Sequence, residues 1–328
     1  MASRIFHNAV LRGIALPTLV LSTTVGGTLY TSESDWANAN LSPWIPIRIF
    51  RPNDYLEIAF DVRTRTPVYV MERLTVTDET TNTDQRRHRF YEEKSLPEWF
   101  RSRNSHYHLS GYDRGHMAPA ADFQDNRSDT YNLINIAPQS SDMNRGVWAG
   151  LEKWTRGVAR RAKQQQYETY VVTGPLWLPQ RKLEDKLFEY QYKGLGNPPS
   201  LVSVPTHLFK VVVVVDPNQP ERAYSIREFA CFVVPNEKLP EKSDYQDFLV
   251  RWTDLEAVTG LTFFPGLVDE SWRNQADKAT EKLKSRQKGP LLLLTDGYST
   301  QSTSFFKMAK VEIMHLCRDG RCSRSSKQ

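Results

Sequence analysis

The most constraining feature of the sequence is the stretch over residues 112–123, which reads YDRGHMAPAADF. An acid, a base, a glycine and a histidine follow one another directly, and a run of small residues comes next. A surface turn could hold these residues for no chemical reason. A glycine and small residues also permit close approach by a neighbouring element, so the meaning of His116 depends on the segments later in the chain.

A helix is predicted over residues 144–165, because apolar positions recur there every three or four residues. Positions spaced four apart form one slowly turning stripe on such a helix, and here they are Asn144, Trp148, Glu152 and Arg156. The amide oxygen of Asn144 is a neutral, hard ligand that suits Mg²⁺, which binds few protein groups and keeps most of its waters. Glu152, about two turns further on, could hold one of those waters.

Each of these residues also has an ordinary structural explanation. His116 could be a buried or turn histidine, and Asn144 could be a helix N-cap. Trp148 is assigned to the core, while Glu152 and Arg156 could form a solvated ion pair. Taken together, the residues favour a catalytic site over these structural explanations, because a histidine before a helix and an amide on that helix form a recurring arrangement for cleaving phosphodiesters. The histidine takes a proton from water, and the metal neutralises charge on the phosphate.

The rest of the chain indicates an α+β protein. Strands are predicted where β-branched and aromatic residues concentrate, over residues 54–76, 167–179, 207–217 and 227–236. A second helix is predicted over residues 245–261 and closed by a glycine. Because strands and helices do not alternate regularly, the pattern argues against a doubly wound parallel sheet. The sequence contains no glycine-rich phosphate loop of the Walker or Rossmann kind.

Composition sets broad limits. At 328 residues and 39% apolar content the chain can bury a substantial core, and a net charge of +5 suits a polyanionic partner without requiring one. The three cysteines form no disulfide framework. Cys317 and Cys322 could pair or bind a metal, although unpaired cysteines of the core or tail are favoured over a local disulfide.

The two ends of the chain differ from its body. The first 32 residues contain no Asp or Glu, and Arg4 and Arg12 precede eighteen residues without a charge. We therefore interpret residues 1–45 as a targeting segment and linker, with a mitochondrial presequence and inner-membrane anchor favoured over a secretory signal. Residues 46–268 are predicted to form the main domain. Residues 269–328 are predicted to be a C-terminal extension that docks on it.

Long segments in the same order carry a family resemblance from about residue 50 to residue 268. They are DRGHMAPAADF from Asp113, NIAPQ from Asn135, WAGLE after Asn144, VVTGPLWLP, SVPTHLFKVVV, FVVPNEKLP and FLVRWTDLEAVTGLTFFPGL. On these motifs the chain resembles the DNA/RNA non-specific endonucleases, and within them the mitochondrial endonuclease G group. The resemblance implies a central, mostly antiparallel sheet flanked by helices, with a ββα-metal active-site motif.

The resemblance also implies roles for particular residues. His116 matches the family's general base, and Asn144 matches the single protein ligand of Mg²⁺ or Mn²⁺. Glu152 matches the acid that holds water on the metal. The supporting polar positions around the phosphate are matched by Arg114, Asn135 and Arg156. The family also uses an upstream arginine to stabilise the pentacovalent phosphate, and we assign this role to Arg87 in the segment that also holds Arg86 and Arg89.

The activity implied by the resemblance is metal-dependent, sugar-non-specific hydrolysis of DNA and RNA that leaves 5′-phosphate and 3′-hydroxyl ends. Contacts to phosphate rather than base edges would explain such breadth. The resemblance further implies a homodimer with DNA and RNA as partners. Two alternatives remain open, namely a catalytically silent nucleic-acid-binding or inner-membrane scaffold protein with the nuclease fold, and a phosphodiesterase acting on small molecules.

Overall fold

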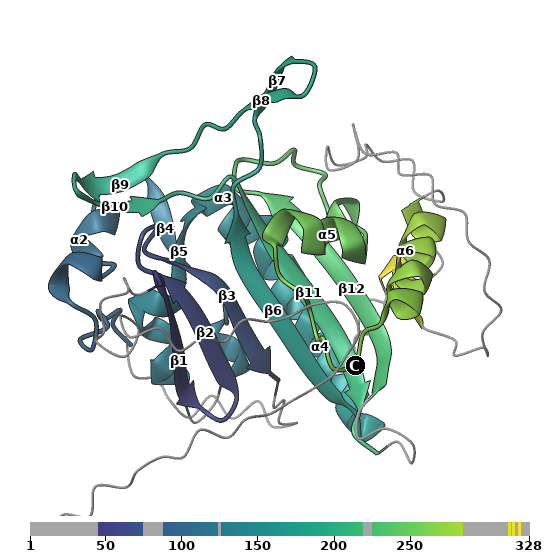
Figure 1. Cartoon of the computed structure of the whole chain (residues 1–328). Helices are drawn as coiled ribbons and strands as arrows, with labels where there is room; N and C mark the ends of the chain where they lie inside the picture. The colour runs from purple at the N-terminus through teal and green to yellow at the C-terminus, as the bar shows by residue number, and fades with distance from the viewer. Residues whose placement is uncertain are drawn as a thin grey trace, which may run out of the picture. The chain divides into compact units, whose positions relative to one another are not determined.

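The computed structural model describes residues 45–74, 88–123, 126–218 and 225–284, and the backbone of three short strands between residues 314 and 322. At the centre of the part described lies a seven-stranded sheet (Figure 1). Its strands, in spatial order, are β1 (Ile47–Asn53), β2 (Leu56–Asp61), β3 (Thr66–Arg73), β6 (Glu168–Leu176), β11 (His207–Asp216), β12 (Ser225–Pro235) and β13 (Met314–His315). Neighbouring strands are antiparallel except for the parallel pair β12–β13. The predicted α+β class with a mostly antiparallel sheet is confirmed.

Smaller hairpins and helices surround this sheet. The hairpins are β4 (Tyr112–His116) with β5 (Ile136–Ser140), β7 (Arg181–Glu184) with β8 (Leu187–Glu189), β9 (Gly194–Asn197) with β10 (Ser200–Ser203), and β14 (Cys317–Arg318) with β15 (Arg321–Cys322). The helices are α2 (Asn104–Tyr107), α3 (Ser141–Met143), α4 (Ala149–Gln164), α5 (Trp252–Thr259) and α6 (Glu270–Lys284). Single turns of 3₁₀ helix are η1 (Glu98–Phe100), η2 (Ala120–Asp122), η3 (Arg127–Tyr131), η4 (Leu133–Asn135) and η6 (Tyr245–Phe248).

Helices cover the main sheet on both faces, with α4 on one side and α5 and α6 on the other (Figure 1). This arrangement explains the unbroken valine run of β11, because a central strand buried on both faces does not alternate apolar with polar residues. All ten residues of β11 except His207 are buried. The two faces have separate apolar clusters, so the sheet divides the core into two layers.

Helix α4 forms where the apolar periodicity predicts it. Leu151, Trp154, Val158 and Ala162 recur at helical spacing and are all buried against the sheet. The turn before it differs from the regular helix that the sequence predicts, because residues 144–148 form a π-helical turn, η5 (Asn144–Trp148). Within that turn Gly146 has non-helical dihedral angles, φ −99° and ψ −107°. Single π-helical turns often occur at functional sites, because they redirect side chains at the turn.

The second predicted helix begins later than expected. Residues 245–248 form the 3₁₀ turn η6, and helix α5 begins only at Trp252. Tertiary pairing explains the difference, since Leu249 forms a bridge with Phe232 and the Val250 amide donates to the Cys231 carbonyl at 3.0 Å. The helix ends as predicted at Gly260, whose φ of 68° favours glycine.

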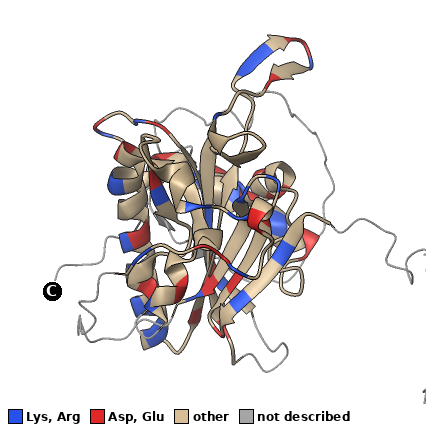
Figure 2. Ribbon diagram, turned by 90° about the vertical axis from the view of Figure 1, so that its left-hand side faces the viewer, with Lys and Arg blue, Asp and Glu red and all other residues tan. Residues whose placement is uncertain are grey.

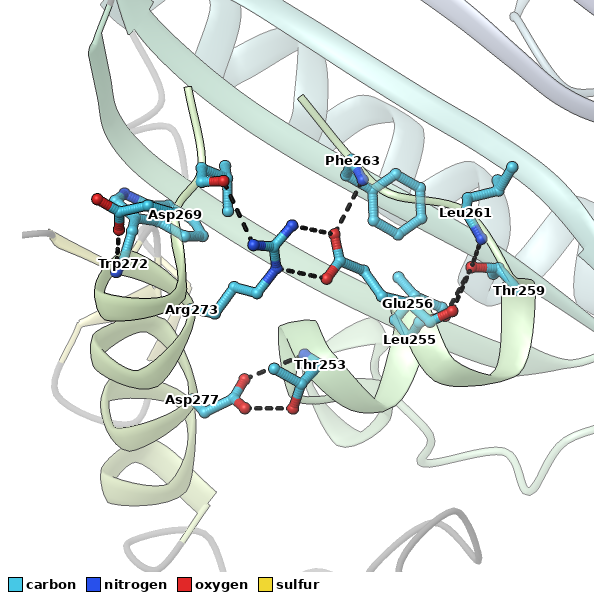
Figure 3. Close-up of polar contacts among 11 residues, drawn as sticks. Thr253, Leu255, Glu256, Thr259, Leu261, Phe263, Asp269, Trp272, Arg273 and Asp277 are labelled. Carbon is cyan, nitrogen blue, oxygen red and sulfur yellow. Dashed lines mark hydrogen bonds and ion pairs between the residues drawn. The ribbon is translucent and has the colours of Figure 1, made fainter. Parts of the chain in front are cut away.

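The segment after residue 268 begins with a helix that docks on the main domain. In Figure 3, Arg273 of α6 reaches Glu256 of α5, with Nε donating to Oε2 at 2.7 Å. Asp277 accepts hydrogen bonds from the backbone and hydroxyl of Thr253. Trp272 and Ala276 join the apolar cluster on this face of the sheet. These contacts make α6 part of the folded body.

Charged side chains are spread over the elements of the described part, as Figure 2 shows with Lys and Arg in blue and Asp and Glu in red. Both colours appear on the helices and on the strands of the sheet. A mixed distribution of this kind agrees with the small net charge of +5. The charges that matter for the site are therefore identified from individual contacts.

The predictions for the targeting segment and for the C-terminal cysteines concern residues that lie largely outside the described part of the chain. The targeting segment lies outside the described residues, apart from its last residue. None of the helices in the described ranges is both long and apolar enough to cross a membrane. Cys231 is free and buried. Cys317 and Cys322 face each other in the register of β14 and β15, while their side chains lie outside the described part.

Candidate active site

The hairpin of β4 and β5 carries the DRGH and NIAPQ motifs. The two strands are antiparallel, with Gly115 opposite Ala137 and His116 opposite Ile136. A Cβ atom on Gly115 would lie 2.0 Å from Cδ of Gln139, so the glycine is required by the close approach of that side chain. The hairpin leads through α3 and η5 into α4, which gives the ββα order.

Asn135 braces the segment directly after His116. Its side chain is fully buried, and its amide donates to the carbonyls of Ala118 and Thr130, each at 2.9 Å. The amide oxygen accepts from the Ala118 backbone at 3.0 Å. Because the protein's own backbone occupies both ends of this amide, any influence of Asn135 on a phosphate would act through the placement of His116.

The ring of His116 lies between aromatic side chains. Its centroid is 5.3 Å from that of Phe90 and 5.0 Å from that of Tyr131, the latter edge to face. The Nε2 atom is buried without a hydrogen-bond partner among the described residues. Burial, and then the charge of Arg127, lower the pKa of His116 from 6.5 to about 4. The imidazole is therefore neutral at physiological pH, which is the form that can accept a proton.

This environment predicts that His116 titrates near pH 4 in the metal-free protein instead of near 6.5. The measurement is a ¹⁵N-edited NMR titration of the imidazoles, with His116 assigned by the loss of its signals in His116→Gln. Arg127→Gln should raise the pKa of His116, because a nearby positive charge disfavours the imidazolium. A midpoint near 6.5 in the wild-type protein would contradict the buried, cation-facing environment.

Asp113 orients Asn144. The amide nitrogen of Asn144 donates to Oδ2 of Asp113 at 3.0 Å, and Arg145 and Ser141 donate to the same carboxylate. Burial alone would raise the pKa of Asp113, but hydrogen bonds from Asn144, Arg145 and Ser141 outweigh it, so its pKa is lowered. The carboxylate can only accept from the amide, so it fixes which end of Asn144 faces Asp113 and leaves Oδ1 available as an acceptor.

Glu152 and Arg156 do not form the solvated pair that was one alternative. Arg156 instead pairs with Asp122 of η2, with Nη1 2.9 Å from Oδ1, and the Asp122 side chain is only 2% exposed. Burial raises the pKa of Glu152 to about 7, while Lys210 opposes this rise. Trp148 is fully buried, as expected of a core residue.

The donor set at Asn144 suits a hard divalent cation held by few protein atoms. No group of three or more His, Cys, Asp or Glu side chains in the described ranges is placed to hold a metal ion. A site built by such a group would hold its ion directly through several protein ligands. One amide oxygen, by contrast, fits an ion such as Mg²⁺ that keeps most of its waters. The residues present therefore fit the expected cofactor.

The remaining predicted residues are arginines, and only some of them lie in the described part of the chain. Arg114 lies 5.5 Å from the ring centroids of both Phe90 and Tyr107, and its Nη2 donates to the Asn104 carbonyl at 3.0 Å. Arg87 lies outside the described residues, as does Arg86. Arg89 is described and exposed. The upstream arginine therefore stays a prediction.

Two residues near the site escaped the sequence analysis. Gln139 is fully buried, and both polar atoms of its amide lack hydrogen-bond partners among the described residues. Lys210 is buried as well, and its ammonium lies 5.1 Å from the ring centroid of Trp148. The available signal was a charged residue between apolar neighbours inside a strand, since Lys210 stands between LF and VVVVV in HLFKVVVVVD.

Comparison with known proteins decides the family. The family model described as DNA/RNA non-specific endonuclease matches residues 48–270. The chain belongs to the DNA/RNA non-specific endonuclease family. The match covers the main sheet from β1 to β12, the β4–β5 hairpin and helices α4 and α5, so the site described above lies wholly within it.

Individual members of the DNA/RNA non-specific endonuclease family are moderately similar to this chain. "Mitochondrial nuclease" of Saccharomyces cerevisiae is 37% identical over 221 residues, which is 66% of this chain and 65% of that protein. "Endonuclease G, mitochondrial" of Homo sapiens is 34% identical over 69% of this chain and 72% of its own length. The match thus spans slightly less than two thirds of the yeast relative.

The fold is shared with a solved structure. The crystal structure of the EndoG/EndoGI complex contains a chain that superimposes with a TM-score of 0.56 and 28% identity. The superposition covers 71% of this chain and 89% of that one. The ββα-metal nuclease fold expected from the sequence is therefore confirmed.

Proposed function

We propose that this protein is a metal-dependent, sugar-non-specific endonuclease that hydrolyses phosphodiester bonds of DNA and RNA and leaves 5′-phosphate ends. The observation that carries the proposal is one strand, β4, that supplies a neutral histidine and the carboxylate that orients Asn144. His116 and Asp113 are both on that strand, and Asp113 bonds directly to Asn144. Membership of the DNA/RNA non-specific endonuclease family and the nuclease names of the relatives support the same conclusion.

In the proposed reaction His116 acts as the general base. Its neutral imidazole takes a proton from the attacking water, a role that a positioned histidine fulfils well. Phe90 and Tyr131 hold the ring on two sides, so its orientation is set before substrate arrives. Arg127 places positive charge near the base, where an approaching phosphate would be attracted.

Asn144 would hold the Mg²⁺ or Mn²⁺ ion through its amide oxygen. When bound, such an ion neutralises charge on the phosphate and on the leaving oxygen. Glu152 of α4 would accept hydrogen bonds from water at the site, and Arg156 donates to Asp122. Arg87 is proposed as the cation that stabilises the transition-state phosphate.

The setting of this activity is proposed from the relatives and from the N-terminal residues. The yeast and human proteins are named as mitochondrial, and residues 1–45 resemble a presequence with an anchor. We therefore infer a mitochondrial protein associated with the inner membrane, and a homodimer as the working form. Secretion remains the alternative destination.

The test is cleavage of plasmid DNA, single-stranded DNA and RNA by the full chain, with and without EDTA. We expect all three to be cleaved, EDTA to stop cleavage, and Mg²⁺ or Mn²⁺ to restore it. A matched assay with a nitrophenyl phosphodiester separates the small-molecule phosphodiesterase. Binding of nucleic acid without cleavage at any metal concentration would instead identify the silent binding protein, and the proposal would be wrong.

A further inference from the structure

Charged side chains from α4, η2 and two strands of the main sheet act on one another, and two of them belong to the proposed site. We call this group the buried charge cluster, and its members are Glu72, Asp122, Glu152, Arg156 and Lys210. Glu72 on β3 and Lys210 on β11 are each 1% exposed. Because burying a charge is costly, such a cluster persists only where its members compensate one another.

Lys210 enters the cluster from the middle of the sheet. Its ammonium donates to the Thr173 hydroxyl of the neighbouring strand at 2.6 Å and lies 5.1 Å from the ring centroid of Trp148. Both contacts are with uncharged groups. An ammonium removed from water without a counter-charge would cost several kcal/mol, so the nearby carboxyl groups must stabilise it.

The charges of the cluster are unequal, with three carboxyl groups and two cations. Arg156 pairs directly with Asp122 at 2.9 Å, while the charge of Lys210 acts on all three carboxyl groups. Neither carboxyl oxygen of Glu72 has a hydrogen-bond partner among the described residues, and burial raises its pKa well above 4.5. The raised pKa makes Glu72 a weaker counter-charge, and Lys210 is the first-named cation that acts on Glu152.

The position of Trp148 links the same lysine to the metal-binding turn. Trp148 is the last residue of the π-helical turn that begins with Asn144, and it is fully buried. A cation held against an indole ring is attracted to it, and this attraction strengthens when water is excluded. Lys210 thus contacts the turn that carries Asn144 and acts electrostatically on Glu152 further along α4.

We propose that Lys210 is a positioning residue of this nuclease, which holds the Asn144 turn through Trp148 and supplies a positive charge toward Glu152. The inference rests on the proposed function for its catalytic meaning. Lys210 touches no reacting atom, so its effect is exerted through these two side chains. The other charged groups that face Glu152 are Asp122 from η2, Glu72 from β3 and Arg156 from α4 itself.

The test measures the Glu152 carboxyl directly, in the full chain without metal. Glutamate labelled with ¹³C at the carboxyl carbon is followed by NMR across pH, and Glu152→Gln assigns the signal. The wild-type pKa is expected at about 7. In Lys210→Met it should rise by about one to three pH units, because a buried opposite charge lowers an acid's pKa by that amount. Lys210→Arg should restore the wild-type midpoint.

The same variants are then compared in DNA cleavage as a function of pH. Lys210→Met should move the acid limb of the rate profile to higher pH and lower the rate at pH 7 by at least ~5-fold, since a midpoint that rises by one unit from about 7 lowers the ionised fraction from about one half to about one tenth. Glu72→Gln should not raise the Glu152 midpoint, because removing a neighbouring carboxyl group cannot disfavour the ionised form of Glu152. Val212→Ala, a buried change on the same strand, should lower stability without moving the midpoint.

Lys210→Gln keeps a donor for Thr173 and tests the same point if the methionine variant fails to fold. The proposal is wrong if the Glu152 midpoint in the Lys210→Met or Lys210→Gln protein matches that of wild type. It is also wrong if Val212→Ala moves the Glu152 midpoint equally, because the effect would then come from a general loss of core packing. If the wild-type chain cleaves no nucleic acid, the titration still reports the link between Lys210 and Glu152, so failure of the proposed function is seen separately.

Discussion

Replacing His116 by alanine is expected to abolish cleavage while leaving nucleic-acid binding largely intact. The neutral imidazole of His116 is the proton acceptor in the proposed reaction, and loss of a general base lowers the rate by ~10²–10⁴-fold. Binding should survive because it comes mainly from arginines and lysines that meet phosphates. The measurement is single-turnover cleavage of plasmid DNA at saturating metal, together with equilibrium binding of a short duplex.

The matched control is His207→Ala. His207 on β11 is also a histidine whose pKa burial lowers to about 4, and no role in catalysis is assigned to it. Its removal tests the cost of losing a partly buried imidazole as such. Cleavage by His116→Ala close to the wild-type rate would overturn the assignment, as would an equal loss of rate in His207→Ala.

Local pattern was enough to predict most of the sheet and helix α4. β11 and β12 are apolar, β-branched runs, and α4 repeats its apolar residues at the helical period, so each element can be recognised without its neighbours. The start of α5 was missed because Leu249 pairs with Phe232, seventeen positions earlier in sequence. A tertiary pairing of this kind overrides a helical pattern that is locally convincing.

In the candidate site, too, local patterns were predictable and tertiary contacts were not. DRGH and the helical stripe predicted roles for His116, Asn144 and Glu152 from residue type and order. The π-helical turn was not predictable, because it accompanies a hydrogen bond from Asn144 to Asp113 across 31 positions. A lysine within a valine run also gives no local sign of the acids it will meet. Lys210 acquires those neighbours only when the chain folds and brings η2, β3 and α4 close to β11.

The role of Asn135 illustrates a further limit. Sequence similarity placed this residue among the polar groups around the phosphate, whereas the structure places its amide on the backbone of Ala118 and Thr130. A motif identifies which residues a site requires. It does not separate a side chain that meets substrate from one that holds the chain behind His116.

Asn144→Ala is expected to remove both cleavage and specific metal binding. Its amide oxygen is the one protein ligand proposed for the ion, and an ion that stabilises transition-state charge contributes several kcal/mol, which corresponds to at least ~10²-fold in rate. Asn144→Asp keeps an oxygen at the same place, so it should bind Mn²⁺ and recover part of the rate. Binding of Mn²⁺ is measured by electron paramagnetic resonance, independently of activity.

Asp113→Asn separates the ligand from its orientation. The substitution leaves Asn144 in place but replaces the carboxylate that holds its amide nitrogen at 3.0 Å, so the amide can turn its oxygen away. Loss of such a supporting partner costs ~10–100-fold in metal affinity or activity. Arg145→Ala should cost less, because its exposed guanidinium bonds to Asp113 without touching the amide of Asn144. If Asn144→Ala binds Mn²⁺ as tightly as wild type, the ion is held by other residues. This geometry would then give no reason for the expected order of effects, in which Asn144→Ala costs most and Arg145→Ala least.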